Sequence, residues 1–187
     1  MVPPSELDGY EIVPMTWTGV IEKGGPEMSF NGTISEVTEQ IREIKRDFTW
    51  DSLRQDLGDP NPEMHKRSKS NLICNVGGDS NADGLGPYTA NAQSAQQALA
   101  ATSGVCSIGP GPRVCTVLLC NKYNAGIWLC NDNDFSISPN CAYLASYAQD
   151  IINQCGQNYV HGVMTTRGQE FDTDNYNVVV GWKWNCP

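Results

Sequence analysis

Hydrophobic residues recur at helical spacing in three stretches of the chain, and each stretch predicts a helix. The first, residues 33–46, opens on a capping box, in which a threonine and a glutamate three residues later cap the helix end. The second, residues 89–101, opens on a threonine that can cap it and carries alanines on one face, so it can pack close to a sheet. The third, residues 138–155, has Ser138 as its N-cap and Pro139 at its first helical position.

Further stretches rich in β-branched and aromatic residues predict strands. They are residues 10–22, 113–120, 126–130, 159–165 and 178–185. Within the first of them Pro14 predicts an edge strand or a broken one, because proline cannot donate a ladder hydrogen bond. Several of the strands are short enough to be antiparallel neighbours in one small sheet. The predicted fold class is therefore α+β, with an antiparallel sheet covered by two or three helices.

The cysteines predict a disulfide framework. The chain has 187 residues and eight cysteines, an even number that is typical of proteins made in an oxidising compartment. A zinc site or reduced core cysteines are the alternatives, but the C-x2-C spacing is absent, and His65 and His161 are the only histidines. We therefore expect no metal site and no cofactor, and four disulfides among Cys74, Cys106, Cys115, Cys120, Cys130, Cys141, Cys155 and Cys186.

Charge changes along the chain where the cysteines begin. Residues 1–67 contain no cysteine and hold 7 basic and 13 acidic residues, whereas residues 68–187 hold 5 and 8. Between these parts, residues 58–67 form a proline-punctuated segment that predicts an exposed linker and ends in Lys66-Arg67. Kexin-like secretory proteases cut after such a dibasic pair where the backbone is accessible. We therefore predict a pro-segment-like N-terminal region over residues 1–67 and a disulfide-rich α+β domain over residues 68–187, released by cleavage after Arg67.

The role of the front part stays open on the sequence alone. A dibasic pair is also ordinary surface charge, and Lys45-Arg46 is a second such pair at a predicted helix end. One strand and one helix cannot bury both of their faces by themselves. The front part is therefore expected to pack on the cysteine-rich part, either as a pro-segment or as an integral layer.

Net charge limits the kinds of partner. The formal net charge is −9, from 12 Lys and Arg against 21 Asp and Glu, which argues against binding to nucleic acid or to an anionic membrane surface. No run of residues approaches the roughly 18–20 apolar residues of a membrane span. The start of the chain has neither the charged nor the apolar region of a signal peptide, so we expect any such peptide to have been removed.

Two oxygen-rich clusters are candidates for a cation site or for turns. The run Asp79-Ser80-Asn81-Ala82-Asp83-Gly84 matches the first half of a calcium-binding loop. The twelfth position is Ala90, so the closing glutamate of such a loop is missing, and we expect an ordinary turn with calcium binding as the alternative. The second cluster, residues 131–134, is expected to cap turns onto its own backbone.

Among enzyme classes, a hydrolase that uses two carboxylates is the one that the sequence argues against least. Motifs for serine hydrolases, metalloproteases and phosphate-binding loops are absent, whereas glycoside hydrolysis needs only two suitably placed carboxyl groups. No spacing selects a pair, and we expect solvated turn residues at Asp132, Asp134, Glu170, Asp172 and Asp174.

Trp182 and Trp184 lie two residues apart on a predicted strand, so their side chains share one face of it. An outward face would be a platform for a ligand or partner, and an inward face would be core under the helices. We expect the second arrangement.

The cysteine-rich part combines residues 113–115, Cys120-Asn121, the run YNAGIWLCNDN at 123–133, a helix ending in Cys155, and residues 168–180 before Cys186. This combination resembles a group of fungal small secreted cysteine-rich proteins, which are candidate effectors and elicitors. The front part, with residues 9–14, Trp17, 24–26 and 30–33, resembles the segment that often follows the signal peptide in such precursors.

More distantly, the order of cysteines, a helix ending in cysteine, a Gly-Gln strand and a terminal cysteine is similar to the smut killer toxin and its fungal relatives. That family has an antiparallel sheet covered by helices. The resemblance implies that Cys74 pairs with Cys155 and Cys120 with Cys186, and it leaves Cys106, Cys115, Cys130 and Cys141 to form two further bonds. This chain has fewer cysteines than the toxin and lacks its basic character, so toxin activity through ion channels does not carry over.

These observations predict a secreted, extracellular, effector-like and non-catalytic protein, made as a proprotein, that binds a host or competitor protein or glycan. A killer-toxin-like antimicrobial protein is the first alternative, and a carboxylate-dependent hydrolase is the second. The sequence leaves the molecular target and the oligomeric state open.

Overall fold

The computed structural model describes residues 7, 9–58, 68–77, 85–156, 158–160 and 162–186, with the backbone alone for 158–160. A six-stranded sheet dominates it. In chain order its strands are β1 (Glu11–Ile12), β4 (Lys69–Cys74), β6 (Val114–Cys120), β7 (Ala125–Asn131), β10 (Gly168–Asp172) and β11 (Tyr176–Trp182). Their order across the sheet is β1-β6-β7-β11-β10-β4, and all neighbours are antiparallel except the parallel pair β1 and β6.

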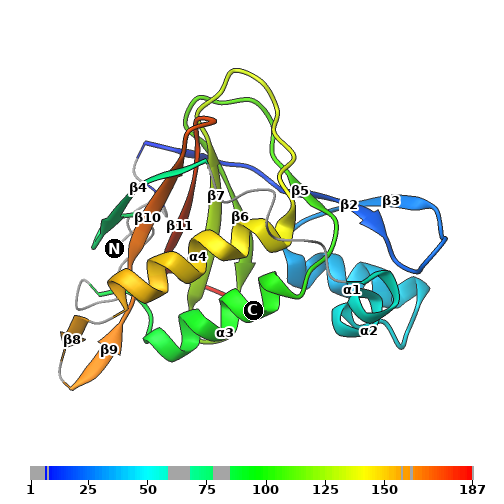
Figure 1. The fold of residues 1–187 in the computed structure, drawn as a ribbon, viewed down its shortest axis with the longest axis horizontal. Coiled ribbons are helices and arrows are strands. Elements are labelled where there is room, and N and C mark those ends of the chain that lie inside the picture. The colour runs from blue at the N-terminus through cyan, green and yellow to red at the C-terminus, as the bar shows by residue number, and fades with distance from the viewer. Residues whose placement is uncertain are drawn as a thin grey trace.

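Two helices, α3 (Thr89–Ala100) and α4 (Cys141–Cys155), lie side by side over one face of this sheet (Figure 1). On that face Leu129 packs in one hydrophobic core with Leu144 and Ile151 of α4. On the opposite face Trp128 belongs to a second buried cluster, to which Leu7 contributes. Because both faces of the central strands are covered, every residue of β6 and β7 is buried, and their hydrophobic pattern does not alternate.

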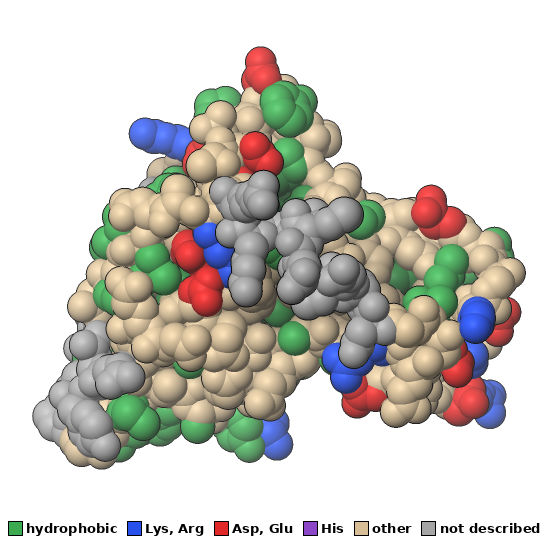
Figure 2. Space-filling view, in the orientation of Figure 1, with side chains coloured by type: hydrophobic (Ala, Val, Ile, Leu, Met, Phe, Trp, Pro, Cys, Tyr) green, Lys and Arg blue, Asp and Glu red, His purple; other side chains and the backbone are tan. Residues whose placement is uncertain are grey.

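The N-terminal residues build a smaller layer beside the large sheet. The strands β2 (Thr16–Val20), β3 (Glu27–Asn31) and β5 (Val105–Ser107) form a three-stranded antiparallel sheet. Helix α1 (Ile34–Ile44) packs on β3 and β6, and helix α2 (Trp50–Leu57) follows it. We call residues 9–58 the N-terminal module and the described residues from 68 onward the body. Figure 2 shows charged side chains gathered over the module, whereas the face over α3 and α4 carries few.

The predicted break at Pro14 is present, and the strands on either side of it belong to different sheets. Before the proline, β1 pairs with β6 of the large sheet. After it, β2 pairs with β5 of the small sheet. The predicted packing of the front part on the cysteine-rich part is therefore confirmed, and one hydrophobic core joins Trp17 and Val37 of the module to Leu118 of the body.

The α+β class is confirmed, and the predicted helices are present, two of them with caps other than those expected. The capping box of α1 is formed between Thr33 and Glu36. Thr89 does not cap α3, because its hydroxyl donates to the Gly156 carbonyl at 2.9 Å instead. At α4 the cap is Asn140, whose side chain accepts from the Tyr143 amide at 3.1 Å, so the helix begins later than predicted. The expected cap of that helix, Ser138, instead accepts a hydrogen bond from the hydroxyl of Ser107 at 2.9 Å.

Two predicted strands differ from the observed ones. Residues 159–165 form a hairpin of β8 (Asn158–Val160) and β9 (Val163–Thr165), because Gly162 turns the chain with φ of 80°. The last strand, β11, ends at Trp182 rather than continuing to 185. The helix α2 and the strands β3, β4, β5 and β10 are additional to those predicted from hydrophobic pattern.

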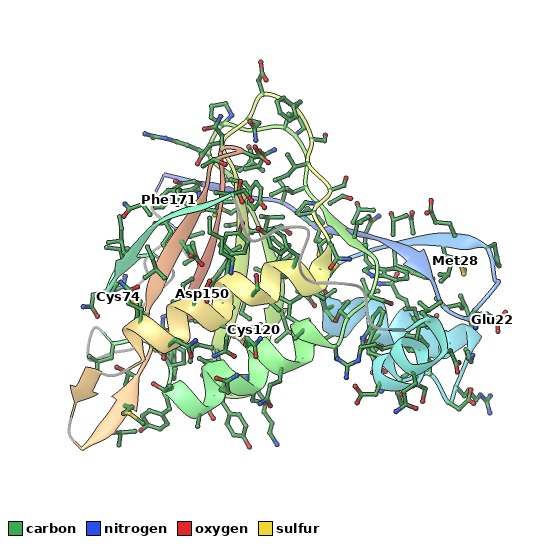
Figure 3. The ribbon with its side chains drawn as sticks, in the orientation of Figure 1. Glu22, Met28, Cys74, Cys120, Asp150 and Phe171 are labelled. Carbon is green, nitrogen blue, oxygen red and sulfur yellow. A yellow bond between two sulfur atoms is a disulfide. The ribbon has the colours of Figure 1, made fainter. Side chains whose placement is uncertain are left out.

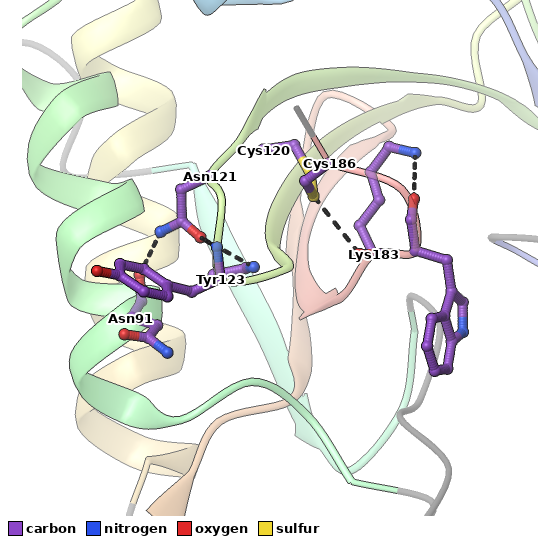
Figure 4. The surroundings of a disulfide bond; sticks show 8 residues. Asn91, Cys120, Asn121, Tyr123, Lys183 and Cys186 are labelled. Carbon is purple, nitrogen blue, oxygen red and sulfur yellow. Dashed lines mark hydrogen bonds between the residues drawn. A yellow bond between two sulfur atoms is a disulfide. The ribbon is translucent and has the colours of Figure 1, made fainter.

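All eight cysteines are paired. The bonds are Cys74–Cys155, Cys106–Cys141, Cys115–Cys130 and Cys120–Cys186. The first and last of these are the pairs that the killer-toxin resemblance implied. Figure 3 labels Cys74 at the end of β4 and Cys120 at the end of β6, and Figure 4 shows the Cys120–Cys186 bond that ties the C-terminal segment to β6.

The turn next to the Cys120–Cys186 bond is fixed to α3 by one side chain. Asn121 accepts hydrogen bonds from the backbone amides of Tyr123 and Ala125 at 3.0 and 3.1 Å (Figure 4). Its amide nitrogen donates to the Asn91 carbonyl of α3 at 2.9 Å. The β6–β7 hairpin is thereby held under the helix layer at its turn.

Replacing Cys74 and Cys155 by alanine is expected to destabilise the protein more than replacing Cys115 and Cys130 by alanine. The first bond joins residues 81 apart in sequence and the second joins residues 15 apart. A disulfide removes more entropy from the unfolded chain when it closes a longer loop, so the two losses should differ by about 1–2 kcal/mol. Equilibrium unfolding in urea measures both, and equal losses would contradict the prediction.

Candidate functional site

Tyrosines and carboxylates gather where α4 crosses β10 and β11. Tyr143 and Tyr147 lie one helical turn apart on α4, with ring centroids separated by 5.1 Å. Strand β10 contributes Glu170 and Asp172, which share one face because alternate residues of a strand point the same way. Strand β11 contributes Tyr176. We call these five residues the tyrosine–carboxylate cluster.

A chain of hydrogen bonds runs through the cluster into the core. The Tyr143 hydroxyl lies 3.1 Å from Oγ of Ser68 and 2.8 Å from the Tyr147 hydroxyl. Tyr147, which is fully buried, donates to Oδ2 of Asp172. The other oxygen of that carboxylate, Oδ1, accepts from the backbone amide of Asp174 at 2.7 Å. Both oxygens of the buried Asp172 side chain are therefore hydrogen-bonded.

Glu170 differs from Asp172 in its hydrogen bonding. It is 5% exposed, and its Oε2 has no hydrogen-bond partner among the residues that the structure describes. Burial is the main cause that raises the pKa of Glu170 to about 7; the nearby carboxylates of Asp150 and Asp172 act in the same direction, and Lys69 opposes them. The carboxyl group of Glu170 therefore keeps its proton to near-neutral pH.

Two hydroxyls of the cluster, those of Tyr147 and Tyr176, remain protonated. Burial raises the pKa of Tyr147, and its hydrogen bond to Asp172 raises it further. Burial likewise raises the pKa of Tyr176. Beside them, Nζ of Lys69 lies 2.5 Å from Oδ2 of Asp150 on α4 (Figure 3) and 4.6 Å from the centroid of the Tyr147 ring. Lys69 is thus paired with a carboxylate and an aromatic face.

A pocket of ≈ 660 Å³ opens at the end of the hydrogen-bond chain. Its walls come from the β7–α4 loop and the β10–β11 turn, which Figure 1 shows close together at the top of the view. Ser68, Tyr143 and Tyr176 belong both to this wall and to the hydrogen-bond network. The other described lining residues are Asn133, Phe135, Ser136, Ile137, Ser138, Pro139, Asn140, Thr173, Asp174 and Asn175. The wall therefore combines aromatic rings with hydroxyl and amide groups, and Asp174 is the charged side chain among the lining residues described.

Two asparagine side chains hold the walls of the pocket together. Nδ2 of Asn131 donates to the carbonyls of Gly109 and Phe135 at 2.9 and 2.8 Å. Nδ2 of Asn133 donates to the Asp174 carbonyl of the facing turn at 2.9 Å. The Asn133 backbone amide also donates to Oδ1 of Asn131 at 3.0 Å, which confirms the predicted turn capping within residues 131–134.

The five candidate carboxylates occupy different environments. The expectation of solvated turn residues is wrong for Glu170 and Asp172, because both lie on β10 and are buried against α4. Asp134 and Asp174 are exposed, as expected. Asp132 is half-buried and accepts a hydrogen bond from the Arg113 amide at 3.3 Å. The structure therefore brings together one buried pair, on a strand that hydrophobic pattern did not predict.

Trp182 and Trp184 do not share a strand face, since β11 ends at Trp182. Their rings meet edge to face with centroids 5.5 Å apart, and both side chains are half-buried. The expected burial in the core under the helices is therefore not the observed arrangement.

Several predicted features lie outside the described residues. These are the dibasic pair Lys66-Arg67, the possible calcium loop at residues 79–84, and both histidines. Across the stretches that are described, no group of three or more His, Cys, Asp or Glu side chains is placed to hold a metal ion. Within the same stretches, none of the helices has the length and apolar character required to cross a bilayer. No protein-family model, curated protein or solved structure matches the chain.

Sequence motifs give no indication of Ser68, Lys69, Tyr143 or Tyr176 as site residues. The available signal is indirect. Tyr143 and Tyr147 have helical spacing on an otherwise aliphatic face, and the two acids on β10 have strand spacing. Only the tertiary contact between helix and strand turns these two patterns into one cluster.

Glu170→Gln is expected to flatten the pH dependence of stability. Between the ordinary pKa of 4.5 and the folded-state pKa of about 7, the folded protein holds a proton on Glu170 that the unfolded chain has released. The wild type should therefore lose stability as pH rises through this window, by on the order of 3 kcal/mol. Urea unfolding at several pH values measures the loss.

The matched control is Glu27→Gln, at an exposed position of β3, which should keep the wild-type slope. If the pH dependence of stability in Glu170→Gln equals that of the wild type, the buried carboxyl group does not titrate in this range.

Proposed function

We propose that this protein is a secreted, effector-like protein that acts outside the cell by binding a host or competitor target, and that it is made as a proprotein cut after Lys66-Arg67. The observation that carries the binding proposal is the pocket beside the tyrosine–carboxylate cluster. Concave sites that mix apolar surface with a few convergent polar groups are the usual form of ligand sites.

The covalent framework supports action in an extracellular medium. Four disulfides in a chain of this length are typical of proteins that work in oxidising, protease-rich surroundings. Each cross-link is expected to add about 2–4 kcal/mol to a stability that is otherwise small. The elements that carry the pocket are among those that these bonds fix.

The chemistry of the pocket wall supports a hydroxyl-rich or peptide-like target. Rings such as Tyr143 and Tyr176 offer apolar faces, while Ser136 and Thr173 offer hydroxyl groups. Such groups bind the mixed surface of a glycan or an extended peptide. The net charge of −9 makes a nucleic-acid target unfavourable.

The state of the buried acids supports binding over catalysis. A carboxylate hydrolase places two carboxyl groups on either side of the bond that it cuts. Here both oxygens of Asp172 are engaged by Tyr147 and the Asp174 amide. Neither Glu170 nor Asp172 is among the residues that line the pocket.

One observation favours a hydrolase as the second candidate. A carboxyl group with its pKa raised to about 7, such as Glu170, has the property that a general acid needs. The killer-toxin-like alternative predicts a different phenotype, selective inhibition of fungal growth without a response in plant tissue.

Ser136→Tyr is expected to abolish target binding by filling the pocket. Ser136 is exposed and lines the pocket, so a larger side chain there leaves the core untouched. Ser94→Tyr, on the exposed face of α3 away from the pocket lining, is the matched control. Plant-tissue response and fungal growth inhibition are measured for both, with a loss of about tenfold or more expected for Ser136→Tyr alone.

Equal activity of the two tyrosine variants would show that the pocket is not the binding site. Glu170→Gln distinguishes catalysis from binding when it is tested in the same assays and in a direct measurement of target binding. Loss of activity with unchanged target binding would favour the hydrolase.

The natural protein recovered from the producing organism's medium is expected to contain a chain that begins at Ser68 and gains about eight mass units on reduction, since each disulfide takes up two hydrogens. Intact-mass measurement before and after reduction gives both results. A full-length species would make residues 1–67 part of the working protein. Free thiols, or absence from the medium, would overturn the secreted assignment.

A further inference from the structure

The N-terminal module is joined to the body by no disulfide. The first cysteine is Cys74, and all four bonds lie within the body. A cut after Arg67 would therefore leave non-covalent contacts as the whole connection between the two resulting chains.

Backbone pairing connects the module to two strands of the body. On the large sheet, the Glu11 amide donates to the Arg113 carbonyl at 2.9 Å, and the Val13 amide donates to the Cys115 carbonyl at 2.8 Å. On the small sheet, β2 lies antiparallel to β5, with Trp17 opposite Cys106. Without the module, β6 would be the edge of its sheet and β5 would have no strand beside it.

Trp17 of β2 is a buried anchor at the junction between the module and the body. Its side chain is 0% exposed, and the indole Nε1 donates to the Ser103 carbonyl at 2.7 Å. Gly104 makes room for it, since a Cβ added there would lie 2.8 Å from the indole nitrogen and 2.6 Å from the Thr18 carbonyl. On the module side the indole packs against Phe30 and Trp50, so the module itself holds the anchor in place.

The junction beside this anchor is less tightly filled. A cavity of ≈ 310 Å³ lies between Arg54, Leu57 and Gly58 of the module and residues 100–104 of the body. Elsewhere at this junction, β2 pairs with β5 and α1 packs against β6.

From these contacts we infer that β5, the edge of β6 and the backbone of Ser103 and Gly104 form a strand-acceptor site, and that the N-terminal module stays bound to it as a separate subunit after the chain is cut. Such a site gains affinity from main-chain hydrogen bonds and selectivity from a side-chain pocket. Its partner is an extended strand that carries an indole. The inference takes its biological setting from the proposed cleavage, but the contacts do not depend on it.

The test begins with full-length protein cut in vitro by a kexin-type protease. Product masses distinguish a cut after Arg67 from a cut after Lys45-Arg46, at the end of α1. Gel filtration and native mass spectrometry over a dilution series then measure the association of the two chains. One complex with the summed mass of both chains is the expected result.

Gly104→Ala is the test variant, and Gly24→Ala is its matched control. Both glycines have positive φ, 84° and 76°, so alanine introduces backbone strain at each. The added methyl meets Trp17 and Thr18 at Gly104, whereas at Gly24 it meets nothing within 4 Å. The dissociation constant of the cut complex should rise about tenfold or more for Gly104→Ala only.

A second pair of variants serves if Gly104→Ala does not fold, as judged by the near-UV circular dichroism of the uncut protein. Trp17→Phe loses the hydrogen bond to Ser103 of the body, whereas its control Thr38→Val removes the acceptor of the Trp50 indole inside the module and leaves both rings in place. Only Trp17→Phe should weaken the complex.

Separation of the wild-type chains on cutting, or equal weakening by a test variant and its control, would overturn the inference. A natural protein that is never cut would refute the proposed processing alone, because the in vitro cut measures the contacts directly.

Discussion

Helix α4 is covalently fixed at both of its ends, and the arrangement of the site depends on this. Its first residue, Cys141, is bonded to Cys106 of β5, and its last, Cys155, is bonded to Cys74 of β4. These strands belong to different sheets, so the helix can neither slide along the large sheet nor turn about its own axis. Tyr143 and Tyr147 are thereby kept over β10, and the loop that enters the helix is kept beside the β10–β11 turn.

The parts of the fold that sequence predicts are those with a local cause. The capping box fixes the start of α1, and the largely apolar, uncharged runs of β6 and β7 are recognisable by themselves. By contrast β5 has three residues, and β4 mixes Lys69 and Asn71 with Leu72. Their strand conformation comes from partners distant in sequence, β2 and β10, and no local pattern encodes such pairing.

Of the five residues in the tyrosine–carboxylate cluster, the sequence offers only Glu170 and Asp172 as candidates, and it gives neither their burial nor their tyrosine neighbours. The run from Gln169 to Asn175 has the composition of a solvated turn, so the burial of Glu170 and Asp172 was not predictable from it. What permits the burial of Asp172 is the Tyr147 hydroxyl, from a helix that packs on the strand only in the folded protein. The pocket was likewise not predictable, because its walls come from two loops about forty residues apart in sequence. The side chain of Asn133 joins these loops by its hydrogen bond to the Asp174 carbonyl.

The short strand β1 has a consequence for solubility. Strand β6 reads VCTVLLC, a run of seven residues without a charge or a proline, and such runs form fibrils when their edges meet copies of themselves. Two residues of β1 cover the start of that edge, and α1 packs against the same strand. While it occupies this position, the N-terminal module shields this aggregation-prone segment of the body. Loss of the module would uncover this edge, and the body would then associate with itself at a lower protein concentration.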